Sequence, residues 1–195
     1  MKKYLFALLL LCSCRSITYQ DINPTIQPNA NKLPSLKPLV EVSNIESVYH
    51  GRRHKDSRIN DTINIFTKEV KENITDPYGK KKGYISLKLG YVENHNEPWL
   101  ILPFMFSFGT SVLAGIPKDI CEQSLEVEVE ILNNKKELIK HYKVNVDNSE
   151  AVAMYYGYHQ KHVYRKLAAD NIKQAMEQIR LQINNDAEEI LKKLQ

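Results

Sequence analysis

Hydrophobic residues recur along the chain with two different periods, and these periods predict where helices and strands lie. Between residues 59 and 74 the apolar positions are three and four residues apart, which indicates an amphipathic helix that ends before Asp76 and Pro77. The same spacing runs from residue 163 to 194 and predicts a long C-terminal helix. The two stripes are Ile59, Ile63, Phe66, Val70 and Ile74, then Val163, Leu167, Ile172, Ala175, Ile179, Ile183, Ala187, Ile190 and Leu194. We expect the long helix to cover a sheet; the alternative is that its last half forms a seam for a partner.

Alternation of apolar and polar residues predicts strands in three other regions. Residues 39–49 and 84–91 each alternate over several positions. The clearest pattern lies at 125–146, where two alternating runs flank a polar turn and predict a β-hairpin with one buried face. Three glutamates on the other face of its first strand are expected to face water or lysines of the neighbouring strand. They are Glu126, Glu128 and Glu130.

The order of these elements predicts the fold class. A strand, a helix, a strand, an apolar segment, a hairpin and a long helix follow one another, and we see no internal repeat. This order predicts an α+β domain with a mixed, mostly antiparallel sheet and helices packed on one face. Residues 39–195 are long enough to form one domain with its own core.

The first residues of the chain, MKKYLFALLLLCSC, form a separate segment. Lys2 and Lys3 precede an apolar run, Tyr4 to Leu11, of eight residues. Eight residues extend only about 12 Å as a helix, against a hydrocarbon core of roughly 30 Å. A positive start, a short apolar run and small residues after it are typical of a signal peptide, which we predict at residues 1–13.

The four residues Leu11-Cys12-Ser13-Cys14 resemble the lipobox of bacterial lipoproteins. The resemblance implies that Cys14 receives a diacylglycerol on its thiol, that the chain is cut before it, and that the new amino terminus is acylated. Two or three acyl chains give lasting membrane residence, whereas one chain is marginal. In this family an Asp after the cysteine often marks the inner membrane; Arg15 therefore implies the outer membrane, facing the periplasm. The alternative is an ordinary secretory signal with a coincidental cysteine.

Composition separates a linker from the domain and limits the classes of partner. Residues 15–38 contain four prolines and no apolar period, so we predict a flexible tether from Cys14 to residue 38. The chain has 27 basic and 23 acidic side chains, a balance that argues against nucleic acid as a partner. Basic clusters at 50–58 and 79–83 are interpreted as solvated loops, with lipid head groups or acidic polysaccharide as alternative contacts. Cys121, alone in the mature domain, is predicted to be a small buried residue.

The segment from Pro98 to Pro117 contains no charged residue and is the most unusual stretch of the domain. Three interpretations are open: a buried core element, a segment that inserts into a membrane or completes an assembly, and a spanning helix. Pro103 and the distribution of lysines around the segment argue against the spanning helix. The candidate residues are Trp99, Leu100, Ile101, Phe104, Phe106, Phe108, Val112 and Leu113.

A second candidate surface lies in the aromatic stretch from Met154 to Tyr164. Its tyrosines and histidines suit contact with sugars or protein; equally, the rings could seal the end of the core. The residues are Tyr155, Tyr156, Tyr158, His159 and His162. We expect no metal site from the histidine pairs and no catalytic triad from Asp147, Ser149 and His159. Asp147-Asn148-Ser149 is interpreted instead as the cap of a turn or helix.

These observations favour a lipid-anchored, non-enzymatic envelope protein that acts by binding. We expect it to be an accessory to an outer-membrane or cell-wall assembly, held by its lipid and contacting an envelope protein, without a cofactor. The alternative is a periplasmic hydrolase acting on cell-wall or glycan material near the tyrosine and histidine stretch. In the order of its elements, the domain is similar to envelope proteins around the curli-secretion lipoprotein and to the N-terminal domain of the Tol propeller protein.

Overall fold

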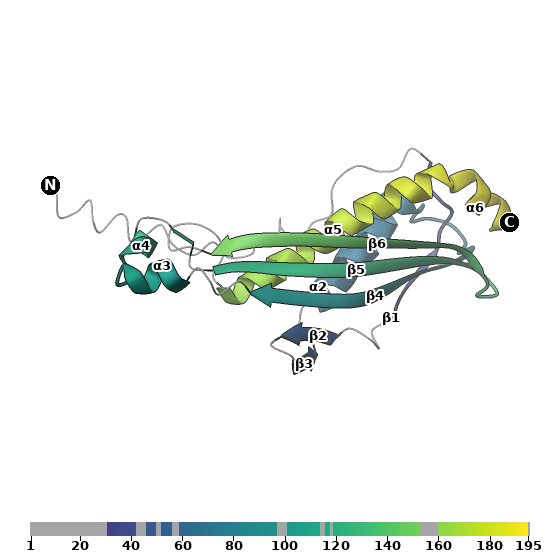
Figure 1. Cartoon of the computed structure of the whole chain (residues 1–195). Helices are drawn as coiled ribbons and strands as arrows, with labels where there is room; N and C mark the ends of the chain where they lie inside the picture. Colours follow the sequence, from purple (N-terminus) through teal and green to yellow (C-terminus); the bar gives the residue numbers. More distant parts are fainter. Residues whose placement is uncertain are drawn as a thin grey trace.

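Helices cover one face of a long sheet in the computed structural model of the protein (Figure 1). The structure describes residues 31–41, 46–49, 52–55, 59–96, 101–113, 116–117, 119–152 and 160–194. Within these residues six strands form one sheet in the order β3-β2-β4-β5-β6, with β1 also paired to β4. The sheet is mixed and mostly antiparallel, so the predicted α+β class is confirmed.

Three long antiparallel strands form the body of the sheet: β4 (Gly83–Asn96), β5 (Asp119–Asn133) and β6 (Leu138–Val152). Strands of this length extend about 50 Å. The pairs Leu125↔Val146 and Val127↔Val144 place the predicted apolar positions on one face, since side chains of directly paired residues lie on the same side. The predicted hairpin is therefore confirmed, and it extends six residues further on each strand.

Polar side chains that face the helices explain this extension. The apolar alternation ends at Leu125 and Val146, but the strands continue beside helix α5 (Gln160–Asn185). There Asn148 Nδ2 donates to Asn171 Oδ1 at 2.6 Å, and Asn171 Nδ2 donates to the Gln123 carbonyl at 3.0 Å. Buried polar groups with such partners do not disfavour a strand. The interpretation of Asp147-Asn148-Ser149 as a cap is therefore wrong, because these residues lie inside β6.

The other edge of the sheet contains three short strands. Strand β1 (Lys37–Glu41) pairs in parallel with the first half of β4, and β2 (Glu46–Tyr49) pairs in parallel with β4 beyond its bulge. Strand β3 (Arg52–Lys55) pairs with β2 and ends the sheet. We predicted one strand over 39–49 and a polar loop after it; both predictions are corrected. A strand of Arg-Arg-His-Lys has no apolar alternation to detect, and charge is typical of an edge strand.

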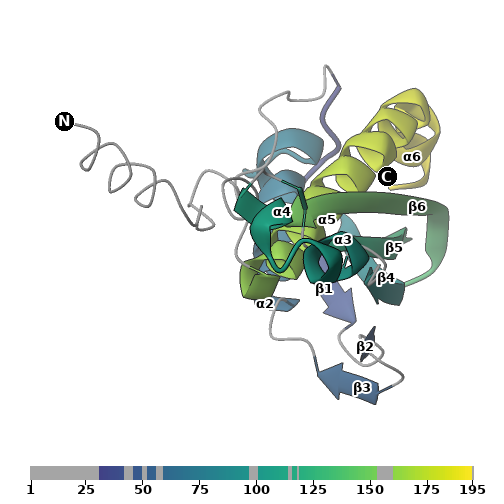
Figure 2. The same cartoon turned by 60° about the vertical axis from the view of Figure 1, so that its left-hand side comes forward.

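Helix α2 (Ile59–Glu69), the π-helical turn η2 (Val70–Ile74), α5 and α6 (Ala187–Lys193) lie on one face of the sheet (Figures 1 and 2). Phe66, Val70 and Ile74 are fully buried, and Ile63 packs partly buried against the core, as the apolar stripe predicts. All nine positions of the C-terminal stripe are buried as well. The two predicted amphipathic patterns are thus confirmed, whereas the π-helical turn has no signal in the pattern.

The C-terminal helix is broken at Asp186 into α5 and α6, where we predicted one continuous helix. Tyr142 of β6 donates its hydroxyl to Asp186 Oδ2 at 3.0 Å, and Lys140 lies 2.7 Å from a carboxylate oxygen of Glu189. These contacts hold α6 against the hairpin. Because the last part of the stripe is buried there, the alternative of a partner-binding seam on this half of the helix is wrong.

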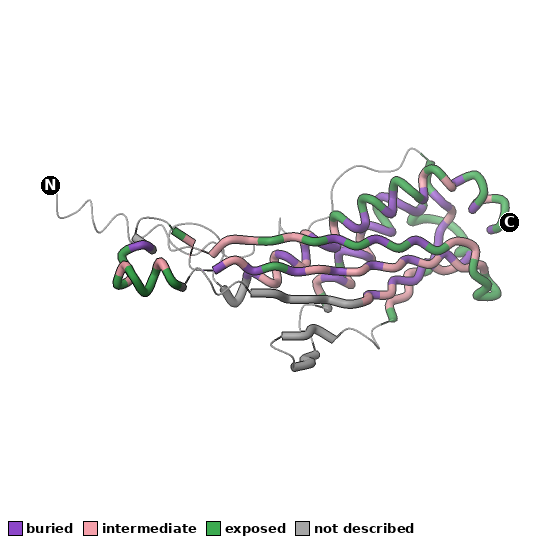
Figure 3. Tube along the Cα trace, in the orientation of Figure 1, coloured by how far each residue is buried: buried purple, intermediate pink, exposed green. Residues whose placement is uncertain are grey.

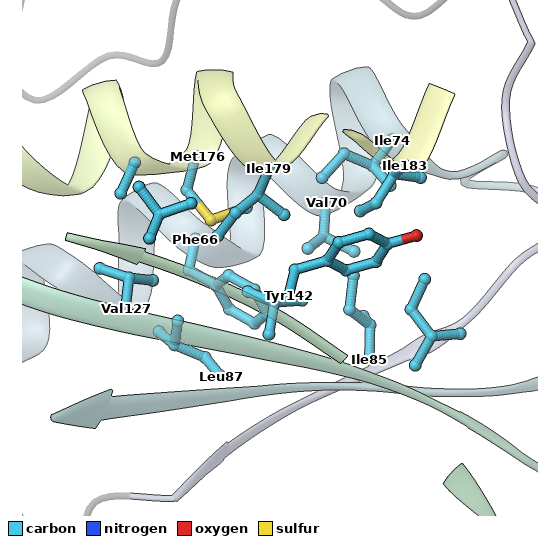
Figure 4. Packing of buried hydrophobic residues seen from close by; sticks show 14 of the residues in the cluster. Phe66, Val70, Ile74, Ile85, Leu87, Val127, Tyr142, Met176, Ile179 and Ile183 are labelled. Carbon is cyan, nitrogen blue, oxygen red and sulfur yellow. The ribbon is translucent and has the colours of Figure 1, made fainter. Parts of the chain in front are cut away.

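The core lies between the sheet and the helices, where Phe66, Leu87, Tyr142 and Ile179 pack together (Figure 4). Leu33 and Leu36 are also buried in this core. The Leu33 amide donates to the Ile74 carbonyl at 2.9 Å. The fold therefore includes the end of the segment predicted as a tether, because two leucines three residues apart fill a space beside η2.

Candidate functional site

Two short helices project from one end of the sheet. They are α3 (Ile101–Phe106) and α4 (Thr110–Leu113), in the connection from β4 to β5 (Figures 1 and 2). Most described residues of this connection are exposed (Figure 3). Large apolar side chains exposed there are Leu102, Phe104, Met105, Phe106, Phe108 and Ile116, and we call the first five, which lie within seven residues, the apolar tip. Phe106 is 84 % exposed and Phe108 is 97 % exposed.

Backbone hydrogen bonds fix the shape of the tip. The Gly109 amide donates to the Phe104 carbonyl at 2.8 Å, and the Phe108 amide donates to the Met105 carbonyl at 3.2 Å. This pair of bonds is the Schellman arrangement that ends many helices. Ser107 Oγ also accepts the Ser111 amide at 3.0 Å, which links the end of α3 to the start of α4. The tip is therefore a folded knob with internal bonds.

Phe108 occupies the left-handed position of this helix end, with φ of 50°. Glycine is the usual residue there, because a side chain in this conformation costs about 1–2 kcal/mol. Gly109 follows at φ 83°, and a Cβ at that position would lie 3.3 Å from the Phe104 ring. The chain thus places a strained phenylalanine at the turn and keeps its ring in solvent. Backbone strain of this kind is concentrated at functional sites.

The apolar tip has the chemistry of a binding surface. Residues 98–117 contain no charged side chain, so a partner that covers the tip removes no ion from water. Each large apolar side chain that becomes fully buried contributes roughly 1.5–3 kcal/mol. Phenylalanine and methionine are enriched in the cores of protein interfaces. The arrangement can bind an apolar groove, and none of the tip side chains supplies an acid, a base or a nucleophile.

Three of the predicted candidates, Phe104, Phe106 and Phe108, belong to the tip. Leu102 and Met105, which are exposed beside them, were not among the predicted residues. The signal that marked the whole segment as a candidate was an uncharged run, longer than a strand and interrupted by Pro103. The pattern of residues within the segment does not show whether Leu102 and Met105 are buried or exposed. Their exposure follows from the position of α3 at the end of the sheet.

The side chains of the other five candidates in this segment lie outside the described part of the structure. Ile101, Val112 and Leu113 lie in helices α3 and α4, and their side chains lie outside the described part, as do Trp99 and Leu100 altogether. For the described residues 102–108, the core interpretation is wrong, because the large side chains there are exposed. Among the described helices, none is both long and apolar enough to cross a bilayer.

The tyrosine and histidine stretch and the lipobox lie mainly outside the described residues. This applies to Cys14, Tyr155, Tyr156, Tyr158 and His159, whereas His162 lies in the first turn of α5 without a described side chain. Asp147 and Ser149 are exposed on β6. In the ranges that the structure describes, no group of three His, Cys, Asp or Glu side chains is placed to hold a metal ion.

Two kinds of reactive side chain elsewhere in the described fold, the Cys121 thiol and the glutamate row of β5, are buried or paired. Cys121 is fully buried, as predicted, and burial raises the pKa of its thiol to about 11, although a hydrogen bond with Tyr164 opposes this shift. At neutral pH it is therefore a thiol and a poor nucleophile. The glutamate row also pairs as expected, with Lys143 Nζ 2.8 Å from Glu126 and Lys88 Nζ 2.8 Å from Glu130.

Comparison with known proteins adds no relative. Neither a family model nor a curated protein matches the chain.

Proposed function

We propose that the protein is a lipid-anchored envelope protein that binds a protein partner through the apolar tip, without catalysis. The lipid on Cys14 would hold it at a membrane, and the tip would fill an apolar groove of an envelope component. The observation that carries the proposal is the exposed tip itself. A cluster of five large apolar side chains on a folded knob is disfavoured in water unless a partner covers it for part of the time.

The position of the tip supports a partner at a distance from the anchoring membrane. Leu33, where the chain enters the core, lies beside Asp76 and Ile74, near the start of β4. The tip follows the other end of β4, about 50 Å along the strands. A flexible segment from Cys14 to Leu33 would span about 23 Å root-mean-square and about 56 Å in polyproline form. The tip would reach the anchoring bilayer only with this segment nearly extended.

The composition of the tip supports a protein groove over a lipid surface. Helices that lie in a membrane interface carry lysine or arginine on their polar face. Residues 98–117 contain neither. A small knob of phenylalanine, leucine and methionine matches the buried anchors of protein interfaces, which a few side chains dominate.

Affinity purification from envelopes tests this proposal. The lipidated protein would be purified in mild detergent beside the variants Phe106→Ser and Phe108→Gly, and the co-purifying proteins measured by quantitative mass spectrometry. We expect at least one protein to be depleted roughly tenfold or more with each variant, since an interface anchor contributes about 2 kcal/mol. The same spectra report acylation of Cys14.

A matched control separates the tip from general surface effects. Leu181 on α5 is 55 % exposed and lies outside the tip, so Leu181→Ser should leave the co-purifying proteins unchanged. Equal depletion by Leu181→Ser and Phe108→Gly, or no depletion by either tip variant, would contradict the proposal. An unacylated Cys14 in the purified mature protein would contradict the anchor alone.

A further inference from the structure

The end of the sheet opposite the apolar tip has a different chemistry. The loop 78–82 leads into β4, and residues 134–138 comprise the turn after β5 and the first residue of β6; the pair Gly83↔Asn133 brings the two together. Figure 1 shows this end beside the C-terminal helix. We call these ten residues the basic end patch. All of them are exposed, and five are lysines: Lys80, Lys81, Lys82, Lys135 and Lys136.

The loop and the turn that carry these lysines contain one acidic residue, and the neighbouring helix α6 carries Glu188 and Glu189, of which Glu189 already pairs with Lys140 and Lys193. Glu137 lies in the same turn, where it accepts a hydrogen bond from Asn133 Nδ2 at 2.7 Å, and Asp76 precedes the loop and accepts the Tyr78 amide at 3.0 Å. Within the described part of the chain, no ion pair engages the five lysines. Two large apolar side chains are exposed between them: Tyr78 at 82 % and Leu138 at 59 %.

We propose that the basic end patch docks on the anionic phospholipid head groups of the membrane that holds the lipid anchor. This inference rests on the proposed function, because it takes the anchor to lie at Cys14. The Asp76 amide donates to the Leu33 carbonyl at 2.8 Å, so the segment toward Cys14 leaves the fold two residues from Tyr78. A linker that joins the fold at this point places the patch nearer to the bilayer than the apolar tip.

The combination of side chains favours a lipid surface over an acidic polysaccharide. Tyrosine and leucine exposed among lysines can enter the boundary between head groups and acyl chains, where an apolar body and a polar tip are both satisfied. A hydrated polysaccharide offers no such boundary. Lysine is a compact, mobile charge that suits a diffuse layer of phosphates, and each lysine near an anionic membrane increases binding about fivefold.

Docking at this end would set the orientation of the whole molecule. The strands run from the basic end patch to the apolar tip, so a domain that rests on the patch presents the tip away from the membrane. The two ends then act on different partners, a lipid surface and a protein groove.

Vesicle binding tests the patch without the anchor. The full chain with Cys14→Ser, which cannot be lipidated there, would be sedimented with vesicles of phosphatidylcholine alone, and with vesicles in which phosphatidylglycerol replaces about a third of it. We compare this chain with the same chain carrying Lys80→Gln, Lys81→Gln and Lys82→Gln. We expect the triple variant to lose roughly 100-fold in binding to the anionic vesicles and nothing on the neutral ones. Any contribution of the apolar N-terminal run is common to both chains.

Matched substitutions make the result specific. Lys80→Arg, Lys81→Arg and Lys82→Arg together retain the charge and should retain binding, and Tyr78→Ser should weaken it by a smaller factor. Equal binding of the glutamine variant and its parent would overturn the inference, as would binding to alginate with none to anionic vesicles. Because lipid on Cys14 is absent from this assay, its outcome is separate from that of the proposed anchor.

Discussion

Phe108 combines a left-handed backbone with an aromatic ring in solvent, and both features act against stability. The backbone conformation costs about 1–2 kcal/mol, and the exposed ring is disfavoured in water. Glycine at the same position would satisfy the helix end at lower cost. The fold of the monomer therefore does not explain the Phe108 side chain, whereas a role of its ring in binding does.

We predict that Phe108→Gly leaves the protein as stable as before or slightly more so. Relief of the left-handed strain is opposed by the larger backbone entropy of glycine in the unfolded chain, so the free energy of unfolding should change by between 0 and about +1 kcal/mol. Urea denaturation followed by circular dichroism measures it. A loss of more than about 1 kcal/mol would show that the ring supports the fold. Weaker binding of the partner by this variant would then result from destabilisation of the fold.

Glu69 and Arg180 form a buried pair of opposite charge between α2 and α5. Both are buried, with Arg180 Nε 3.8 Å from Glu69 Oε1, and Asn73 Nδ2 donates to Glu69 Oε2 at 2.6 Å. Burial raises the pKa of Glu69 above 4.5, Glu72 and Glu177 add to this, and Asn73 and Arg180 oppose it. Because the folded state binds this proton more readily than the unfolded state, the contribution of Glu69 to stability is greatest below pH 4.5 and is lost as the pH rises above it.

Arg180→Met should therefore destabilise the protein in a pH-dependent way. At pH 7 a buried carboxylate loses its guanidinium, and we expect the free energy of unfolding to fall by about 3 kcal/mol. As the pH falls toward 4.5, Glu69 takes up a proton and the deficit should shrink. Urea denaturation of both proteins at pH 7 and pH 5 checks this. An identical deficit at both pH values would assign the effect to lost packing alone.

At the scale of elements, apolar periodicity predicted what is buried, and polar contacts decided where elements end. The stripes of α2 and α5 and the inward face of β5 and β6 follow directly from the order of residues. The last residues of the hairpin depend on Asn171, and the break at Asp186 depends on Tyr142, partners that are distant in the chain. Such partners cannot be read from local spacing. Likewise, the uncharged segment predicted a site at Phe106 and Phe108, but their exposure depends on where the fold places α3.

We predict that Asn171→Ala loosens only the extended end of the hairpin. The substitution removes the hydrogen bonds with Gln123 and Asn148, and the free energy of unfolding should fall by about 1–3 kcal/mol. Hydrogen exchange followed by mass spectrometry should accelerate in peptides covering 119–124 and 147–152 more than in those covering 125–131. Asn145→Ala, at an exposed position of β6, serves as the control. Uniform acceleration along both strands would show that the polar contacts do not stabilise this end separately.

The whole molecule has two chemically distinct ends joined by one sheet. The apolar tip lies in the connection from β4 to β5, whereas the basic end patch lies beside the hairpin turn, and the helices occupy the face between them. The sequence contains these segments as separate runs of residues; β4 separates the loop 78–82 from the tip, and the antiparallel pairing of β4 with β5 brings the hairpin turn beside that loop.

The direction of the strands has a mechanical consequence. Inter-strand hydrogen bonds lie across the strand axis, so a force applied between the two ends of the sheet runs perpendicular to them and loads many of them at once. Separation of β1, β4 and β5 by such a force would require the strands to slide past one another in shear, which resists better than peeling one bond at a time. A molecule pulled between a bilayer and a large assembly would therefore resist extension along the direction of its strands.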